Sequence, residues 1–156
     1  MDLRRIVLRA ILPFLLPKTI AWAEEKAQQV ASSGRTLTDQ ERWLARGVGV
    51  AKPETVRISL VDTLPLPESP VLRTAALQAG LLTPDMVGLT LGYSVFVRKG
   101  CEDLRILSHE FRHVYQYEQA GSIAAFLPGY LKQVVQFGYS SAAFEKDARA
   151  HERDNS

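Results

Sequence analysis

The pentapeptide His109-Glu110-Phe111-Arg112-His113 places two imidazoles and one carboxylate within about one turn of a helix. Histidines four residues apart lie one above the other on a helix face, so both can reach the same ion. Zn²⁺ binds neutral imidazole and lowers the pKa of its bound water towards 7. A carboxylate beside that water, here Glu110, can accept its proton and pass it to a leaving amine. The motif therefore predicts a zinc site in which His109 and His113 are ligands and Glu110 is the general base.

The helix that carries the motif is predicted over residues 102–119, and Gly121 terminates it. Its apolar residues form one stripe, and the two histidines lie roughly on the opposite side, so they are not ordinary core side chains. The alternative is a pair of histidines that are hydrogen-bonded on the surface of a helix, without a metal. The stripe consists of Leu104, Leu107, Phe111 and Val114.

A catalytic zinc site needs a third protein ligand and one open coordination position. A His-x-x-Gly-x-x-His extension would supply this ligand, but Gln116 and Gln119 occupy the required places. Glu145 is the preferred third ligand, because its predicted helix can fold back antiparallel to the motif helix. The alternatives are His151, Asp147 and Glu118.

Two segments, Leu107–Glu118 and Phe144–Arg149, resemble the gluzincin metallopeptidases, in particular small, poorly characterised bacterial members of that group. The resemblance implies a compact zincin-like domain in which a small sheet, an active-site helix and C-terminal helices surround one Zn²⁺. It also implies that the two motif histidines and a glutamate from a later helix bind the metal, here His109, His113 and Glu145. The motif glutamate is then the general base.

The chain departs from the gluzincin pattern at one position of the later segment. The family usually has an acidic residue four positions after the glutamate ligand, which steadies the first histidine, whereas this chain has Arg149 there. Asp147 is the acidic residue that could take over this role.

Substrate binding is predicted at the run from Gly88 to Arg98, which looks like the edge strand that borders the cleft in this architecture. An extended peptide can add to such an edge by backbone hydrogen bonds. Thr90, Gly92 and Ser94 are the predicted substrate-binding positions. The alternative is an ordinary strand of the sheet, with Gly92 at a bulge.

A hydrogen-bond donor is also needed where negative charge develops on the carbonyl oxygen in the transition state. Tyr139, six residues before Glu145, is the predicted donor. The other candidates are Tyr93, Tyr117 and His151.

The elements that position these residues are predicted from caps, periodicity and breaks by glycine or proline. Thr38 and Glu41 form a capping box, and Pro128 and Gly129 kink or split a later helix. Helices followed by a small sheet and further helices indicate an α+β fold, as one domain over residues 1–156. The predicted helices cover 18–32, 38–47, 70–79, 102–119, 122–137 and 140–153, the last capped by Ser140 or Ser141. The predicted strands cover 55–61 and 87–98, the latter as two short strands or one bent strand hinged at Gly92.

Composition narrows the function classes. The 156 residues carry a net charge of only +2 and have no basic run interleaved with aromatics, so no nucleic-acid partner is expected. The single cysteine, Cys101, excludes an internal disulfide and fits a reducing compartment.

The N-terminus combines Arg4, Arg5 and Arg9 with an apolar stretch and a small-x-small pattern at Ala21–Ala23. Pro13 and related breaks interrupt the stretch, so residues 1–23 are interpreted as a helix on the domain, a peripheral membrane contact or a signal-like segment. We expect a cytoplasmic protein with membrane association; export is the alternative. The oligomeric state is left open.

Three functions follow from these features. The leading hypothesis is a zinc metallopeptidase that acts on a peptide or protein substrate. The second is a non-catalytic zinc-binding module. The third is a membrane-peripheral interaction protein that carries the His-Glu-x-x-His pattern by chance.

Overall fold

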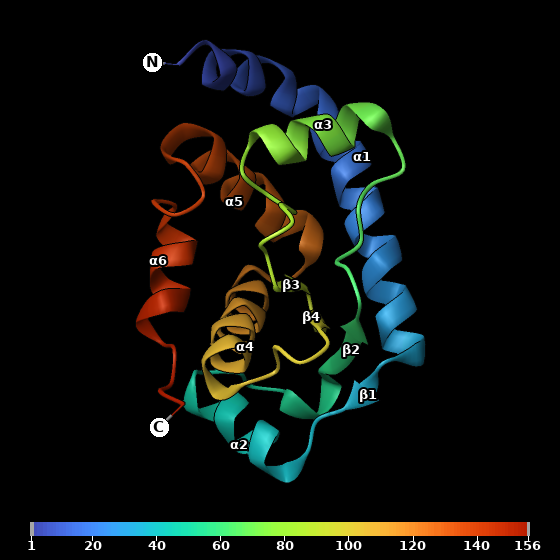
Figure 1. Ribbon diagram of the computed structural model, residues 1–156, viewed down its shortest axis with the longest axis vertical. Helices are drawn as coiled ribbons and strands as arrows, with labels where there is room; N and C mark the ends of the chain where they lie inside the picture. Colours follow the sequence, from blue (N-terminus) through green and yellow to red (C-terminus); the bar gives the residue numbers. More distant parts are fainter. Residues whose placement is uncertain (1, 156) are drawn as a thin grey trace.

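The computed structural model describes residues 2–155, which form helices packed around one small sheet (Figure 1). This arrangement confirms the predicted α+β class. The helices are α1 (Leu3–Ser33), α2 (Asp39–Gly47), the short 3-10 helix η1 (Pro53–Thr55), α3 (Pro70–Gln78), α4 (Leu104–Ala120), α5 (Ile123–Phe137) and α6 (Ala143–Ala150). The strands are β1 (Arg35–Thr36), β2 (Arg57–Val61), β3 (Gly88–Leu91) and β4 (Ser94–Arg98).

The sheet is mixed and has the strand order β1-β2-β4-β3. The central strands β2 and β4 are parallel, while β1 and β3 run antiparallel to their neighbours at the two edges. β3 and β4 form a hairpin, and Gly92 in its turn has a φ of 66°, which favours glycine. The run 87–98 therefore forms two short strands on either side of Gly92, as one of its two readings predicted, and only β3 lies at the edge.

Helices cover both faces of the sheet, and β4 contributes to both cores. Val95 and Val97 pack in a cluster with residues of α2 and α4, whereas Phe96 packs with residues of α1 and α5. Because side chains alternate along a strand, the middle of a central strand that is covered on both faces is apolar, as residues 95–97 are here. The layers are thus α1 and α5 on one side of the sheet and α2 and α4 on the other.

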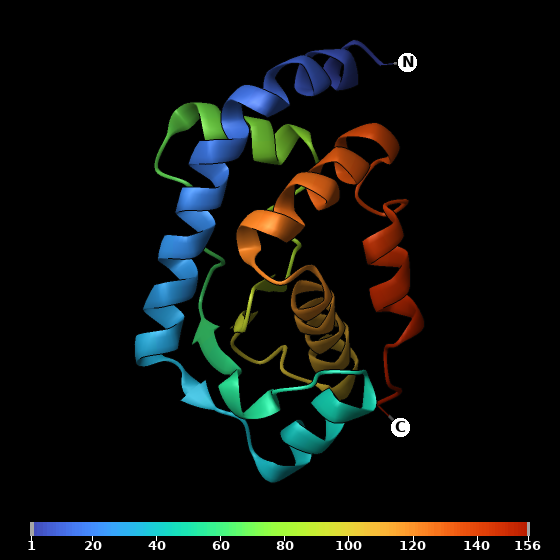
Figure 2. The same ribbon diagram turned by 180° about the vertical axis from the view of Figure 1, so that it is seen from behind.

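Helix α1 is much longer than predicted. It begins at Leu3, so the predicted start near Lys18 is wrong, and residues 3–23 are part of the same helix. Pro13 and Pro17 each lack the N–H for one helical bond, yet the helix continues through them and bends along its length (Figures 1 and 2). Contacts with α3, α5 and the sheet hold it in place despite the lost bonds.

Helix α1 is also the one helix among residues 2–155 that is long and apolar enough to cross a membrane. A signal sequence near the N-terminus would meet the same criteria of length and composition. The small-x-small pattern lies inside this helix, where Ala23 is 1% exposed in the core. Length and composition thus leave a membrane-related role for α1 open.

Helix α5 has the predicted bounds to within one residue, whereas α6 differs from prediction. Pro128 does not split α5, which is continuous from Ile123 to Phe137. Helix α6 is shorter than predicted and is not capped by Ser140 or Ser141; its N-cap is the buried Ala142, which has no side-chain cap. The serines belong to a turn in which the N–H groups of residues 141 and 142 donate to the carbonyls of residues 138 and 139.

Candidate metal centre

Helix α4 presents the His-Glu-x-x-His motif from a well-defined helix. Asp103 caps its first turn by accepting from the N–H of Ile106, and Gly121 ends it in the left-handed conformation, as predicted. The predicted stripe is buried in the core at Leu107, Phe111 and Val114, although its first member, Leu104, is exposed. Burial of this stripe turns the two histidines towards α6.

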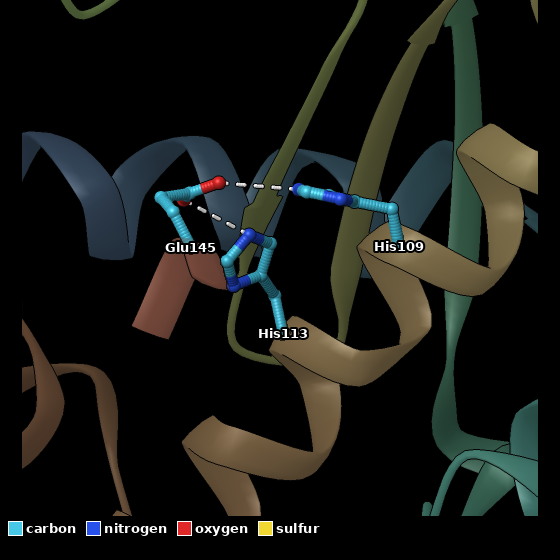
Figure 3. A group of neighbouring side chains, drawn as sticks. All are labelled: His109, His113 and Glu145. Atoms are coloured by element: carbon cyan, nitrogen blue, oxygen red, sulfur yellow. Dashed lines mark hydrogen bonds and ion pairs between the residues drawn. The ribbon is translucent and has the colours of Figure 1, made fainter. Parts of the chain in front are cut away.

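The two histidines and Glu145 come together, as predicted. Nε2 of His109 lies 3.2 Å from Oε1 of Glu145, and Nε2 of His113 lies 3.0 Å from Oε2 (Figure 3). Their ligand atoms all lie within 4.8 Å of one another, and Glu145 is only 1% exposed. In the described part of the chain, these three residues are the one group that could hold a metal ion.

The outer nitrogens of both imidazoles are held by hydrogen bonds. Nδ1 of His109 lies 2.8 Å from Oε2 of Glu152, and Nδ1 of His113 lies 2.8 Å from Oε1 of Gln116. The amide nitrogen of Gln116 donates to the carbonyl of Phe144 and to Asp147, which fixes the amide oxygen towards His113. Both Nδ1 atoms therefore face acceptors and carry a proton, so in neutral imidazole each Nε2 offers its lone pair to an ion.

The residue that steadies the first histidine is Glu152, not Asp147. Asp147 instead accepts from the guanidinium of Arg112 at 2.8 and 3.2 Å, and from Gln116. Glu152 follows the end of α6, where the chain folds back towards α4. The predicted replacement at Asp147 is therefore wrong, because Arg112 on α4 already pairs with that carboxylate.

Glu110 lies beside the three ligand residues in a fixed orientation. Its Oε1 accepts from the hydroxyl of Thr90 at 2.8 Å, and the side chain is only 6% exposed. A Cβ atom placed on Gly88 would lie 2.6 Å from Oε2 of Glu110, which is closer than atoms can approach. Strand β3 thus determines where the predicted general base can lie.

Two tyrosines lie close to the carboxylates. The hydroxyl of Tyr130 donates to Oε2 of Glu145 at 2.7 Å. Tyr139 lines the same cavity as Glu110 and Glu145. Burial and then the negative charges of Glu145 and Glu110 raise the pKa of Tyr139. Tyr139 therefore keeps its proton near neutral pH and can donate a hydrogen bond.

The charges of the cluster are strongly coupled. Burial opposes ionisation of Glu145, but the hydrogen bonds from His109 and His113 and the charge of His113 outweigh it and hold the pKa of Glu145 well below its usual value. Burial likewise opposes protonation of His113, yet its bond to Glu145 and the charge of that residue raise its pKa to about 9. The buried carboxylate therefore requires positive charge, and a divalent cation supplies it in place of protons. The donor set thus fits a metal ion.

Other predicted residues lie elsewhere or have another role. Nδ1 of His151 bonds to the carbonyl of Asp147 at 2.8 Å, and His151 is not in the metal group. Ser94 lies on the interior strand β4, where its hydroxyl donates to the carbonyl of Ala27. The carboxylate of Glu118 accepts from the backbone N–H groups of residues 51 and 52 and from the hydroxyl of Tyr93. Glu118 and Tyr93 therefore bond to each other, away from the metal group.

A cavity of about 140 Å³ begins at the metal group and extends between α1, α3 and α5. Glu110, His113, Glu145 and Tyr139 line its polar end. The rest of the lining is almost wholly apolar. The candidate centre therefore adjoins a cavity whose walls are mostly apolar.

Comparisons of the chain with protein-family models, with curated proteins and with solved structures found no match.

Four residues of the site were not predicted from the sequence. Gln116, one turn after His113, could have been found from its i+3 spacing. Gly88 opens a predicted strand, where a glycine indicates close approach of another group. Glu152 and Tyr130 carry no local signal, because their roles depend on how α5 and α6 pack against α4.

Proposed function

We propose that the protein is a zinc-dependent hydrolase of peptide bonds, with His109, His113 and Glu145 as ligands and Glu110 as the general base. One observation carries the proposal. Two correctly oriented Nε2 atoms and a buried carboxylate converge on one point, and a second carboxylate, Glu110, lines the same cavity. Two imidazoles and one carboxylate are a donor set typical of catalytic zinc.

The chain's own residues supply the remaining chemistry. Zn²⁺ at this site would act as a Lewis acid and make water a nucleophile near neutral pH. Glu110, fixed by Thr90, accepts the proton of the attacking water and returns it to the leaving amine. Tyr139 donates to the carbonyl oxygen as negative charge develops there. The backbone of the edge strand β3 pairs with an extended peptide.

Metal content is the first test of this proposal. Protein purified without added metal should contain about one zinc per chain by mass spectrometry, and Glu145→Ala should lose most of it. The matched control is Glu25→Ala, which changes an exposed glutamate of α1. A wild-type protein without zinc, even after zinc is added back, would contradict the proposal.

Activity separates an enzyme from a non-catalytic zinc module. Glu110→Gln should retain zinc but lose hydrolysis of a peptide library, because the amide cannot accept the proton of water. Zinc bound tightly by a wild-type protein that cleaves no peptide would favour the non-catalytic module. Cleavage that survives in Glu110→Gln would exclude Glu110 as the base.

We further propose that the first half of α1 contacts the surface of a membrane on the cytoplasmic side. Only 11% of its most apolar 18-residue window is buried, and Phe14 is 79% exposed. Residues 3–23 contain basic but no acidic side chains, which favours an anionic lipid surface.

A further inference from the structure

The cavity beside the metal group has the size of one large side chain. Its volume is about 140 Å³, and an apolar cavity of about 150 Å³ holds one benzene molecule. A phenyl ring or an isobutyl group therefore fills this space, whereas an indole ring system is too large for it. The size of the cavity thus restricts which substrate residue can use it.

The walls of the cavity suit an apolar group. Helix α3 contributes Ala75, Ala76 and Ala79, whose small side chains leave the space open. Among residues 2–155, no lysine or arginine lines the cavity, and the carboxylates of Glu110 and Glu145 at its polar end already accept hydrogen bonds from neighbouring hydroxyls. A charged side chain that entered would lose its hydration without gaining an ion partner.

The loop between α3 and β3 brings a leucine to this cavity in a disfavoured backbone conformation. Leu82 has a φ of 55° and is the one residue other than glycine with a positive φ in the described part of the chain. It lines the cavity but belongs to neither hydrophobic core cluster. Left-handed backbone is unfavourable for leucine, and residues held in it concentrate at functional sites. The position of Leu82 is therefore better explained by the cavity than by the core.

The edge strand β3 connects the cavity with the proposed substrate. Its residues Gly88–Leu91 line the cavity together with Glu110 and Glu145. Successive side chains of an extended peptide point in opposite directions. A peptide paired with this edge therefore directs the side chain of one residue near the metal group into the cavity.

We propose that the cavity accepts one apolar side chain of the size of leucine or phenylalanine, from the substrate residue next to the cleaved bond, and that Leu82 sets the upper limit of that size. This inference rests on the proposed peptidase function and specifies its substrate class. A smaller side chain leaves part of the wall without contacts. A tryptophan side chain collides with Leu82.

Binding can be measured without catalysis. The probes are the N-acetyl amides of alanine, leucine, phenylalanine, tryptophan and lysine, titrated by calorimetry into the Glu110→Gln protein with and without added zinc. The leucine and phenylalanine amides should bind at least about tenfold more tightly than the alanine amide, because their side chains are buried on binding. The tryptophan and lysine amides should bind no better than the alanine amide. Equal affinity for the alanine and leucine amides, or a preference for tryptophan or lysine, would overturn the assignment.

Variants of the loop test the role of Leu82. Leu82→Ala should raise the affinity for the tryptophan amide about tenfold or more, and Leu82→Gly, which also relieves the backbone, serves if that protein does not fold. Leu77→Ala makes the same change at a leucine of α3 that is 40% exposed, and should alter no affinity. The same affinity for tryptophan in the Leu82 and Leu77 variants would overturn the role of Leu82.

A variant of α3 tests the location of the bound side chain. Ala76→Phe fills the cavity and should weaken binding of the leucine and phenylalanine amides at least about tenfold, with Ala79→Leu as the second variant. Gln78→Phe adds the same group on the exposed face of α3 and should change nothing. Melting temperatures verify that each variant is folded. Equal binding to the Ala76→Phe and Gln78→Phe proteins would place the probes elsewhere and overturn the inference.

Cleavage of a peptide library separates this inference from the proposed function. Products of the wild-type protein should carry leucine, phenylalanine or another apolar residue of that size next to the cleaved bond. Zinc-dependent cleavage without this preference would contradict the inference alone. A preference for the leucine and phenylalanine amides in a protein that never takes up zinc would contradict the proposed peptidase function alone.

Discussion

Under the proposed function, individual residues outside the ligand set determine how well the centre binds metal and reacts. Glu152 and Gln116 orient the imidazoles, Tyr130 holds the glutamate, and Gly88 leaves room for Glu110. None of these four is a ligand or the base itself. Each of them can therefore be changed while the three proposed ligands and Glu110 stay in place.

Removing Glu152 should weaken zinc binding while all three ligands remain. Loss of the carboxylate on Nδ1 leaves His109 free to rotate and less basic, which typically costs about 10–100-fold in metal affinity. Competition with a chelator measures the affinity of the Glu152→Ala protein. The control is Asp154→Ala, an exposed acidic residue two positions later. An affinity equal to that of wild type would show that Glu152 does not support the centre.

A methyl group on Gly88 should lower the rate of hydrolysis but leave metal binding unchanged. Gly88→Ala forces the Glu110 carboxylate to move, and displacement of a catalytic group by about 1 Å can cost on the order of 100-fold in rate. Zinc content should stay at the wild-type level. Gly129→Ala is the matched control, because a Cβ there meets nothing within 4 Å. Wild-type kcat/KM in Gly88→Ala would argue against Glu110 as the base.

Single elements were predictable where their signals are local. The Thr38–Glu41 capping box, the start of α3 at Pro70 and the end of α4 before Gly121 depend only on neighbouring residues. Helix α1 was misjudged at its prolines, since packing against α3 and α5 decides its extent. The approach of the two histidines was predictable because helical spacing places them on one face. Glu145 was predicted from the position of a later helix and from the gluzincin resemblance.

The capping box of α2 gives a prediction with a defined pH dependence. Glu41 accepts from the N–H of Thr38 and from Arg35 at 2.7 and 2.9 Å. Burial opposes its ionisation, but these partners outweigh burial and lower the pKa of Glu41. Glu41→Ala should therefore lower the free energy of unfolding by about 1 kcal/mol at pH 7.

The direction of the pH dependence of stability follows from the lowered pKa of Glu41. The stabilisation by Glu41 is present above the unfolded pKa of about 4.3 and is lost as pH falls through the folded value. Denaturant unfolding of wild type and Glu41→Ala should thus differ at pH 7 and converge in acid. Glu25→Ala, on the exposed surface of α1, should match wild type at both pH values. A difference that persists at low pH would mean that the carboxylate charge is not the cause.

At the scale of the whole molecule, the two ends differ in character. Helices α1, α3 and α5 converge at one end, and α2 lies at the other (Figures 1 and 2). Exposed apolar side chains at the first end include Leu3, Phe14, Val71 and Phe137. The cavity and the apolar surface therefore share one end of the molecule. Under the proposed membrane contact, this end faces the lipid surface.

This orientation predicts a position-dependent effect on membrane binding. Phe14→Ser should reduce co-sedimentation with anionic vesicles about tenfold or more, because burial of a phenyl group contributes roughly 1.5–3 kcal/mol. Trp43→Ser, which removes an aromatic residue of similar exposure from α2, should have no effect. Higher salt should weaken binding of both proteins, since the basic residues of α1 act through a screened attraction. Equal losses in the two variants would mean that the protein binds lipid without a preferred end.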